Sequence, residues 1–421
     1  MGLLADLEAR GLVHDSTEVA ELAKRLDAGP IGVYVGFDPT ADSLHVGHLL
    51  GQITLRRMQL AGHRPVALAG GATGMVGDPS GKSEERNLLD AETLACNVAS
   101  IKAQLERLLD FTPGPNAAVL VDNVHWTAPM GTLEFLRDVG KHVTVNQMLA
   151  KESVRSRLQS ENGLSYTEFS YMLLQANDFR HLCATMDVEM QMGGSDQWGN
   201  ITAGMDLIRR TLGRPSYGLT WPLVTRSDGQ KFGKTASGAV WLDQSKTSPF
   251  QFRQFWMQLT DEDIVSLFPR FSLRQMPDIA SLLAEHLAAP ERRLAQRALA
   301  DEMCLLVHGQ EAAASTAEAA GILFGEDPVG ASPAVLEVLA GEVPTAELST
   351  AQRGDLFAAL AGTGVVGSTS EARRLVSQGA IRINGTVVQE QDALKTLPLL
   401  HGRWFLVRRG KTAWALWSVE V

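Results

Sequence analysis

The chain has 421 residues, 45% of them hydrophobic and 20% charged, so at about 150 residues per domain it is long enough for two or three domains. Charged or polar residues interrupt every apolar stretch before about 18 residues, which argues against a membrane-spanning helix, and the composition excludes disordered and collagen-like chains. The net charge of −10 argues against a nucleic-acid partner, because binding to phosphates relies mostly on lysine and arginine.

The cysteines and the first residues indicate the compartment. Cys96, Cys183 and Cys304 are far apart and have no CxxC spacing, which argues against a disulfide framework or a thiolate zinc site. The first ten residues contain acids, where a secretion signal has a basic flank and an apolar core. We therefore expect a protein of the reducing cytoplasm, without a bound metal and without a membrane partner.

The first 240 residues alternate short apolar runs with stretches of helical periodicity. The runs that predict buried strands are 31–37, 65–69, 118–121 and 188–192. The stretches that predict helices are 49–61, 91–109 and 197–211. Such alternation predicts an α/β domain over residues 1–245, in which helices flank a parallel sheet.

The remainder of the chain divides by composition. In residues 246–325 strand patterns are absent, and leucines, alanines and acids recur at helical spacing, which predicts an all-helical domain. Glycine, alanine and proline are frequent from 327 to 345, so we predict a linker at 326–352, with its prolines breaking any helix. Residues 353–421 hold nine Lys or Arg against five Asp or Glu, a charge of +4, which leaves −14 for the residues before them. The tail is therefore predicted to be a separate, basic domain.

The segment YVGFDPTADSLHVGH, residues 34–48, runs from a predicted strand through a Pro/Asp turn into a helix. N–H groups at a helix N-terminus favour anions. His45 and His48 share one face of the first turn, where imidazoles can donate hydrogen bonds to phosphate, and Gly47 lets a flat base approach the backbone. A metal pair or two structural histidines remain alternatives, although zinc pairs on a helix are more often four residues apart and no third ligand is nearby.

A glycine-rich stretch, GGATGMVGDPSGKSEER at residues 70–86, follows the second predicted strand. It is not a P-loop, because Gly77 and Gly81 enclose three residues where that motif requires four. What remains is a turn that carries Asp78, Lys82 and Arg86. Cations on such loops are usually solvated surface, but the position after a strand favours a binding site.

Two further motifs carry polar groups. In QMGGSDQWGN, residues 191–200, Ser195 is not the nucleophile of a GxSxG turn, because Gln197 occupies the position of the second glycine. Asp196 suits an acceptor for ribose hydroxyls, or a helix N-cap. In KFGKT, residues 231–235, two lysines beside a hydroxyl predict a flexible cationic clamp for polyphosphate, although KxxK also occurs by chance on many surfaces.

HVGH and KFGKT, about 185 residues apart, resemble the HIGH and KMSKS motifs of class I aminoacyl-tRNA synthetases. The stretches YVGFDPTADSLHVGHL, GGATGMVGDPSGKSEER, FSYMLLQANDF and QMGGSDQWGNI resemble the bacterial tyrosyl-tRNA synthetase family, and EARRLVSQGAIRINGTVV resembles an S4-type RNA-binding module. The resemblance covers essentially the whole chain in the family's order. It departs at KFGKT, which lacks the middle Met and Ser, and at Val35 and Gly51, where relatives can place a side chain against the adenylate ribose.

The resemblance implies a fold and an activity. The fold is a Rossmann-like, nucleotide-binding catalytic domain with a connective insert at about 110–170 that forms much of a homodimer interface, then a helical anticodon-region domain and a small α+β S4-like RNA-binding domain. The activity is the reaction of L-tyrosine with ATP, with Mg²⁺ on the phosphates, followed by transfer of tyrosine to the 3′-terminal adenosine of tRNA(Tyr). The net charge then describes an acidic body that carries a basic tail.

The resemblance also implies residue roles. Tyr34 and Asp178 would hydrogen-bond the phenol of the substrate, and Tyr171, Gln175 and Asp78 would hold its α-ammonium. Gln191 and Gln197 lie near the carboxylate of the substrate, with Gly194 and Asp196 at the ribose. The residues implied for ATP binding are Gly36, Asp38, Gly47, Gly194, Asp196, Gln197 and Lys234. The residues implied to stabilise the reacting phosphate are Thr40, His45, His48, Lys82, Arg86, Lys231, Lys234 and Thr235.

Three alternatives remain open. A tryptophanyl synthetase shares the fold and both signature motifs, but Tyr34 with Asp178 and the S4-like tail favours tyrosine. A small nucleotidyltransferase with an HxGH motif would need neither the helical domain nor the tail. An RNA-binding paralogue without activity is disfavoured by the intact histidines and lysines of the two signature motifs.

Overall fold

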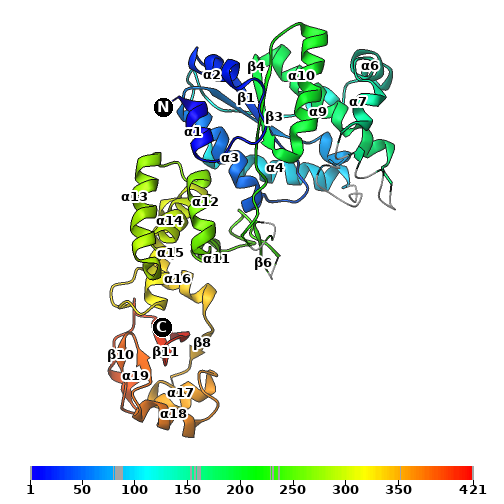
Figure 1. The fold of residues 1–421 in the computed structure, drawn as a ribbon. Coiled ribbons are helices and arrows are strands. Elements are labelled where there is room, and N and C mark those ends of the chain that lie inside the picture. The colour runs from blue at the N-terminus through cyan, green and yellow to red at the C-terminus, as the bar shows by residue number, and fades with distance from the viewer. Residues whose placement is uncertain are drawn as a thin grey trace. The chain divides into compact units, whose positions relative to one another are not determined.

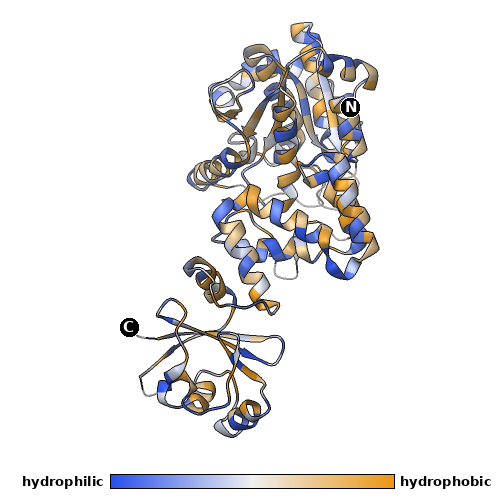
Figure 2. Ribbon diagram, turned by 90° about the vertical axis from the view of Figure 1, so that its left-hand side faces the viewer, coloured by the Kyte–Doolittle hydropathy of each residue, from blue (hydrophilic) through white to orange (hydrophobic). Residues whose placement is uncertain are grey.

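The computed structural model describes residues 2–419 except 79, 81–88, 152–153, 156–157, 159–162, 228, 230–231, 236–237 and 351. The chain forms two compact units (Figure 1), one of Met1–Ser248 with Phe255–Val307 and the other of Pro249–Gln254 with His308–Val421. In Figure 2 the helices of both units are banded with hydrophobic and hydrophilic residues, as expected for helices that bury one face.

The sheet of the first unit has five parallel strands in the order β3-β2-β1-β4-β5. The strands are β1 (Gly32–Phe37), β2 (Arg64–Ala69), β3 (Val119–Asp122), β4 (Val188–Gly194) and β5 (Tyr217–Trp221). The direction of the strand order reverses between β1 and β4, where Tyr34 lies opposite Gln191. In open α/β sheets ligands bind at the carboxyl ends of strands beside such a reversal.

Helices cover both faces of this sheet, and the alternating side chains of β1 show which helix lies on each face. Tyr34 packs on Phe179 of α9 (Tyr166–Met186), with ring centroids 5.4 Å apart. Val35 and Phe37 point to the other face, toward α3 (Val46–Leu60). In Figure 1 α9 lies beside α10 (Trp198–Leu212), whereas α4 (Ala91–Leu108) is on the side of α3.

The α/β fold class is confirmed. Each predicted strand and helix exists with ends within a few residues of those expected, whereas β5 was not predicted because Gly218 and Thr220 interrupt its apolar run. The other helices of this part of the chain are α1 (Leu3–Ala9), α2 (Val19–Asp27), α5 (Val124–Thr127), α6 (Thr132–Asp138) and α7 (Val145–Leu149). No helix in the described ranges is long and apolar enough to cross a membrane.

The regular elements described between 249 and 325 are helical, as predicted, but they divide between the two units. They are α11 (Pro249–Met257), α12 (Asp261–Phe271), α13 (Met276–Ala288), α14 (Leu294–His308) and α15 (Gln310–Leu323). Within the first unit, Arg10 and Arg57 connect the end of α12 to the α/β part of the chain. Both donate to the carbonyl of Ser272, at 3.0 and 2.6 Å. Cations at a helix C-terminus are favourable.

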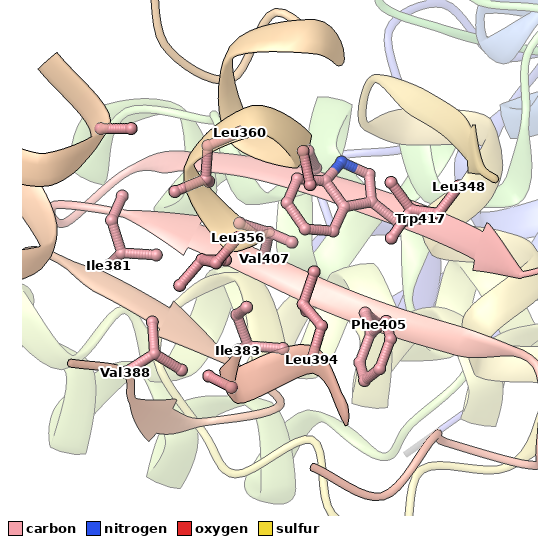
Figure 3. Close-up of a cluster of buried hydrophobic side chains, with 14 of the residues drawn as sticks. Leu348, Leu356, Leu360, Ile381, Ile383, Val388, Leu394, Phe405, Val407 and Trp417 are labelled. Carbon is pink, nitrogen blue, oxygen red and sulfur yellow. The ribbon is translucent and has the colours of Figure 1, made fainter. Parts of the chain in front are cut away.

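The second unit is an α+β domain whose sheet has the order β10-β9-β11-β12-β8. Its elements are β8 (Thr345–Leu348), α17 (Leu356–Gly362), α18 (Thr369–Ser377), β9 (Ile381–Ile383), β10 (Thr386–Val387), α19 (Ala393–Thr396), β11 (Trp404–Arg409) and β12 (Ala413–Val419). Figure 3 shows Phe405, Val407 and Trp417 packed with Leu356 and Leu360 of α17. The alternate strand residues, Leu406 and Leu416, pack with α15 and α16 on the opposite face.

The prediction of a linker at 326–352 is wrong for much of that segment. It contains α16 (Pro333–Glu342) and strand β8, which pairs in parallel with β12. Pro333 occupies the first turn of α16 behind Ser332, whose hydroxyl accepts a hydrogen bond from the Val335 N–H at 3.4 Å. Proline is favoured at the start of a helix because no N–H is needed there, so it begins this helix instead of preventing one.

Candidate active site

A cavity of about 310 Å³ lies at the carboxyl ends of β1 and β4. Of the predicted site residues, it is lined by Tyr34, Gly36, Asp38, Thr40, Gly47, His48, Asp78, Tyr171, Gln175, Asp178, Gln191, Gly194, Asp196 and Gln197. A larger cavity of about 900 Å³ beside α10 contains none of them. The residues predicted for the amino acid and for the nucleotide therefore share one cavity.

One end of the cavity is closed by Tyr34 and Asp178, whose exposed fractions are 1% and 2%. The carboxylate of Asp178 accepts hydrogen bonds from Asn123 Nδ2 at 3.0 Å and from Trp126 Nε1 at 2.8 Å. The hydroxyl of Tyr34 is buried and has no hydrogen-bond partner among the described residues. Because an unpaired buried hydroxyl is costly, this end of the cavity is suited to a polar ligand.

Burial governs the protonation of both groups. It raises the pKa of Asp178 to about 7, against the opposing effect of the hydrogen bonds from Asn123 and Trp126. Burial and the nearby Asp178 carboxylate raise the pKa of Tyr34 well above its usual value. Near neutral pH Tyr34 is thus a neutral hydrogen-bond donor, whereas Asp178 is divided between its charged and neutral forms.

A chain of hydrogen bonds leads from this end toward Asp38. Asn123 also donates to Thr73 Oγ1 at 3.1 Å, and Thr73 donates to Asp38 Oδ1 at 2.9 Å. The other Asp38 oxygen accepts from the Tyr171 hydroxyl at 2.8 Å. A Cβ at Gly70 would collide with Asp38 Oδ1, which explains the glycine there. Asp38, predicted with the nucleotide group, therefore contacts a residue predicted for the amino acid.

A second polar chain lines the cavity around Gln175, one helical turn from Tyr171 on α9. Gln197 Nε2 donates to Asp78 Oδ2 at 2.8 Å, and Gln175 Nε2 donates to Gln197 Oε1 at 3.3 Å. Asn200 Nδ2 donates to Gln175 Oε1 at 3.0 Å, which fixes the orientation of that amide. Burial raises the pKa of Asp196 at the rim. The carboxylates on this wall favour a cationic ligand group such as an ammonium.

The two histidines of the HVGH motif cap the N-terminus of α3. His45 Nδ1 accepts from the Gly47 N–H at 3.0 Å, His48 Nδ1 accepts from the His45 N–H at 3.2 Å, and the rings stack 3.9 Å apart. Since each Nδ1 accepts, each neutral ring carries its proton on Nε2 and can donate there. His48 lines the cavity and His45 does not. Among the described residues, no three His, Cys, Asp or Glu side chains form a group that could hold a metal.

The segment around the second signature motif lies directly against the first. The Val46 N–H donates to the Val240 carbonyl and the Leu242 N–H to the Leu44 carbonyl, both at 2.9 Å. Gly233 has a φ of +84°, and a Cβ there would lie 3.2 Å from the Gly47 nitrogen. The two motifs thus meet at their glycines, and the positive φ and the close approach account for Gly233.

Several predicted residues are not placed by these contacts. The backbone of Lys234 and Thr235 forms the short strand β6 (Lys234–Thr235), which pairs with β7 (Gly238–Ala239). The side chains of both residues lie outside the described part of the chain, and so do Lys82, Arg86 and Lys231. The predicted contribution of these cations to phosphate binding stays a prediction.

Comparisons with known proteins agree with this geometry. The family "tRNA synthetases class I (W and Y)" matches residues 26–325, and the "Tyrosine--tRNA ligase SYY-like C-terminal domain" matches 336–417. The tyrosine–tRNA ligases of Opitutus terrae and Anaeromyxobacter dehalogenans are 51% and 50% identical to this chain, each over 99% of both proteins. The chain belongs to the bacterial tyrosyl-tRNA synthetase family. A C-terminally truncated mitochondrial tyrosyl-tRNA synthetase of Aspergillus nidulans is 31% identical and superposes with a TM-score of 0.71 over 77% of this chain and 94% of its own.

Several residues that line this cavity or hydrogen-bond to its lining side chains were not predicted from the sequence of this synthetase family member. Asn123 and Trp126 follow β3 directly, so their position after the predicted strand 118–121 could have identified them. Thr73 and Asn200 lie inside two of the recognised motifs, but their side chains gave no distinguishing pattern. Trp221 ends β5, which was itself not predicted.

Proposed function

We propose that this chain activates L-tyrosine with ATP and transfers it to the 3′-terminal adenosine of tRNA(Tyr). The closed end of the cavity carries the proposal, because the unpaired Tyr34 hydroxyl and the Asp178 carboxylate together suit a phenol. The phenol O–H donates to Asp178 and its oxygen accepts from Tyr34. Phenylalanine would leave both groups unpaired, a form of discrimination for which tyrosyl-tRNA synthetases are themselves the reference case.

The polar walls of the cavity hold the rest of the amino acid. Tyr171, Gln175 and Asp78 bind the α-ammonium, and Asp38 supports Tyr171 through their 2.8 Å hydrogen bond. Gln191 and Gln197 contribute amide groups near the carboxylate, and Oε1 of Gln191 is buried without a partner in the described part of the chain. The carboxylate is thereby directed toward the nucleotide end of the cavity, where its attack has to occur.

The nucleotide end stabilises charge during the attack. The tyrosine carboxylate attacks the α-phosphorus of ATP, which enters with Mg²⁺ on its phosphates, and pyrophosphate leaves. The Nε2 donors of His45 and His48, Thr40 and the loop cations Lys82, Arg86, Lys231 and Lys234 with Thr235 stabilise the pentacoordinate phosphorus. Gly36 and Gly47 give the nucleotide close access to backbone, and Gly194 and Asp196 bind the ribose. The reaction requires no covalent enzyme nucleophile.

In the second step the terminal hydroxyl of the tRNA attacks the acyl carbon, and AMP leaves. The C-terminal unit supplies the RNA contacts, which agrees with the charge of +4 in residues 353–421. The compartment of this reaction is a reducing cytoplasm, as the wide spacing of the three cysteines predicts.

The chain acts as a homodimer through the insert at about 110–170. Large hydrophobic side chains in that segment are exposed, among them Leu133 at 83% and Tyr166 at 74%. Exposed apolar side chains gathered in one segment favour a protein interface. Sedimentation equilibrium of L133D should show a shift toward monomer, whereas unchanged dimers would remove this surface from the interface.

The test of the function is aminoacylation of total tRNA with each amino acid in turn, together with ATP–pyrophosphate exchange. Tyrosine is expected to support both reactions. Exchange with tryptophan but not with tyrosine would overturn the proposal in favour of the other branch of the matched family. RNA binding without any exchange would indicate an inactive paralogue.

A further inference from the structure

His181 is a half-buried side chain on α9 to which the roles given above assign nothing. Its ring stacks on the indole of Trp126 from α5, with ring centroids 4.4 Å apart and ring planes inclined by 14°. Neither side chain belongs to the described residues that line the cavity. An effect of His181 on the site therefore has to pass through Trp126.

The same indole holds the carboxylate at the closed end of the cavity. Trp126 Nε1 donates to Asp178 Oδ1 at 2.8 Å. Asp178 and His181 are three residues apart, so they lie on one face of α9 in consecutive turns. The indole consequently spans one turn of α9, with its N–H on Asp178 and its ring on His181.

The stack fixes the plane of the indole. A side chain held by one hydrogen bond can still rotate about its χ angles, and Trp126 is half-buried on a helix of only four residues. A parallel ring on His181 restricts this rotation, because stacked aromatic rings retain their contact only while their planes stay aligned. The direction of the N–H bond toward Asp178 thus depends on the ring at position 181.

That direction matters because several effects compete at Asp178. Burial raises its pKa to about 7, and the carboxylates of Asp38 and Asp122 act in the same direction. The hydrogen bonds from Asn123 and Trp126 oppose the increase, since they favour the charged form. Loss of the bond from Trp126 would therefore leave fewer Asp178 side chains charged at neutral pH.

Other titratable and charged groups lie close to this pair of residues. They are Tyr34, Asp38, Tyr171 and Asp122 with its ion-pair partner Lys102 around Asp178, and Arg180 beside His181. Burial raises the pKa values of both tyrosines well above the usual value, so they stay neutral up to pH 8.5. Burial and Arg180 lower the pKa of His181, so its ring is neutral at pH 7 and above. We therefore assign a transition just above pH 7 to Asp178.

We propose that His181 is a positioning residue for recognition of the substrate phenol, because its ring holds Trp126 in the orientation that keeps the Asp178 carboxylate charged and in place. This inference rests on the proposed function, since it takes tyrosine as the ligand at this end of the cavity. His181 does not touch the substrate and is not a catalytic residue. The role requires a flat ring at position 181 and does not require the imidazole nitrogens.

The first experiment measures kcat/KM for tyrosine in ATP–pyrophosphate exchange between pH 6 and pH 8.5. H181A is expected to lose about threefold at pH 7 and to come within about 1.5-fold of wild type at pH 8.5, where Asp178 is charged even without the aligned indole. KM for ATP should not change. H181F keeps a flat ring and should reproduce the wild-type profile. An equal loss at every pH, or no loss, would overturn the inference.

M186A is the matched control. Met186 is also half-buried on α9, and it packs against the same hydrophobic cluster as Trp126. This variant loses packing on the helix but keeps the stacked rings, so its activity relative to wild type should not depend on pH. A pH-dependent loss like that of H181A would show that a loosened α9, and not the missing stack, changes Asp178, and would overturn the inference.

The indole N–H of Trp126 provides a readout that does not depend on activity. In a ¹H–¹⁵N spectrum its signal is the one that W126F lacks. The signal should titrate with Asp178 in wild type and H181F, and its midpoint should lie at higher pH in H181A. An unchanged midpoint in H181A would overturn the inference while wild-type exchange upholds the proposed function. If wild type shows no tyrosine-dependent exchange, the proposed function fails, whereas this signal still decides whether His181 positions Trp126.

Discussion

The two ends of the cavity are formed by different kinds of chemical groups. At the phenol end, buried side chains hold each other, with Asn123 and Trp126 fixing the Asp178 carboxylate. At the end proposed for the nucleotide, the backbone at the N-terminus of α3 meets Gly233, and the cations proposed to act there come from the motifs at 70–86 and 231–235. Selection between similar amino acids requires rigid, buried hydrogen-bond partners. Attack on a phosphate instead requires hydrogen-bond donors and positive charge around a phosphorus whose coordination changes during the reaction.

The largest expected effect is the loss of the phenol partner. D178A should lower kcat/KM for tyrosine at least a hundredfold, because it removes the acceptor for the phenol and leaves the donors of Asn123 and Trp126 unpaired. KM for ATP should change little, as measured by pyrophosphate exchange. The control is D206A, whose carboxylate lies on α10 outside this cavity. Equal losses for tyrosine and ATP would mean that Asp178 acts on the whole site and not on one end.

A smaller effect is expected at the opposite end. K234A should slow adenylate formation about thirtyfold in single-turnover experiments, because a cation that stabilises the transition state is lost. KM for tyrosine should be nearly unchanged. K246A, an exposed-loop substitution that removes an ion pair with Asp42, should leave the rate close to that of wild type. If K234A formed adenylate at the normal rate, the Lys234 side chain would have no part in the chemistry.

The Tyr34 hydroxyl should have opposite effects on selectivity and stability. Y34F is expected to reduce discrimination between tyrosine and phenylalanine about tenfold, because one of the two hydrogen bonds to the phenol is lost. It should also stabilise the free protein by about 1 kcal/mol, since it removes a buried hydroxyl to which no described residue hydrogen-bonds. Calorimetry and exchange assays on the same preparation check both. A lower Tm would show that the hydroxyl is paired in solution.

The smallest effect is a pH dependence of stability that depends on Asp178. Its pKa is raised to about 7 in the folded protein, from the usual 3.8 of an aspartate, so between these values the folded state binds more protons than the unfolded state. Stability from this group therefore falls as pH rises through this range and levels off above about 7. The Tm of wild type relative to D178A should fall by a few degrees between pH 5 and pH 8. A difference independent of pH would contradict the raised pKa.

The sequence predicted most of the side chains at the Tyr34 and Asp178 end of the cavity, and fewer of the residues that hydrogen-bond to them. The polar stripe of Tyr171, Gln175 and Asp178 could be read because helical spacing alone places these residues on one side. Asn123 could not be assigned to Asp178, because they are 55 residues apart and no local pattern relates them. The predicted linker failed for a related reason, since proline both ends and begins helices and only the packing of α16 on the C-terminal sheet distinguishes the two.

The sequence by itself determined the fold class, the order of the motifs and the family, because periodicity and motif spacing are properties of neighbouring residues. It also showed that an average charge of −10 conceals a basic tail. Only the tertiary structure decided that Gly47 meets Gly233, that Asp38 holds Tyr171 and that the Trp221 ring lies against Gly51. Such contacts join segments far apart along the chain, and their geometry depends on how strands and helices pack, which no local pattern encodes.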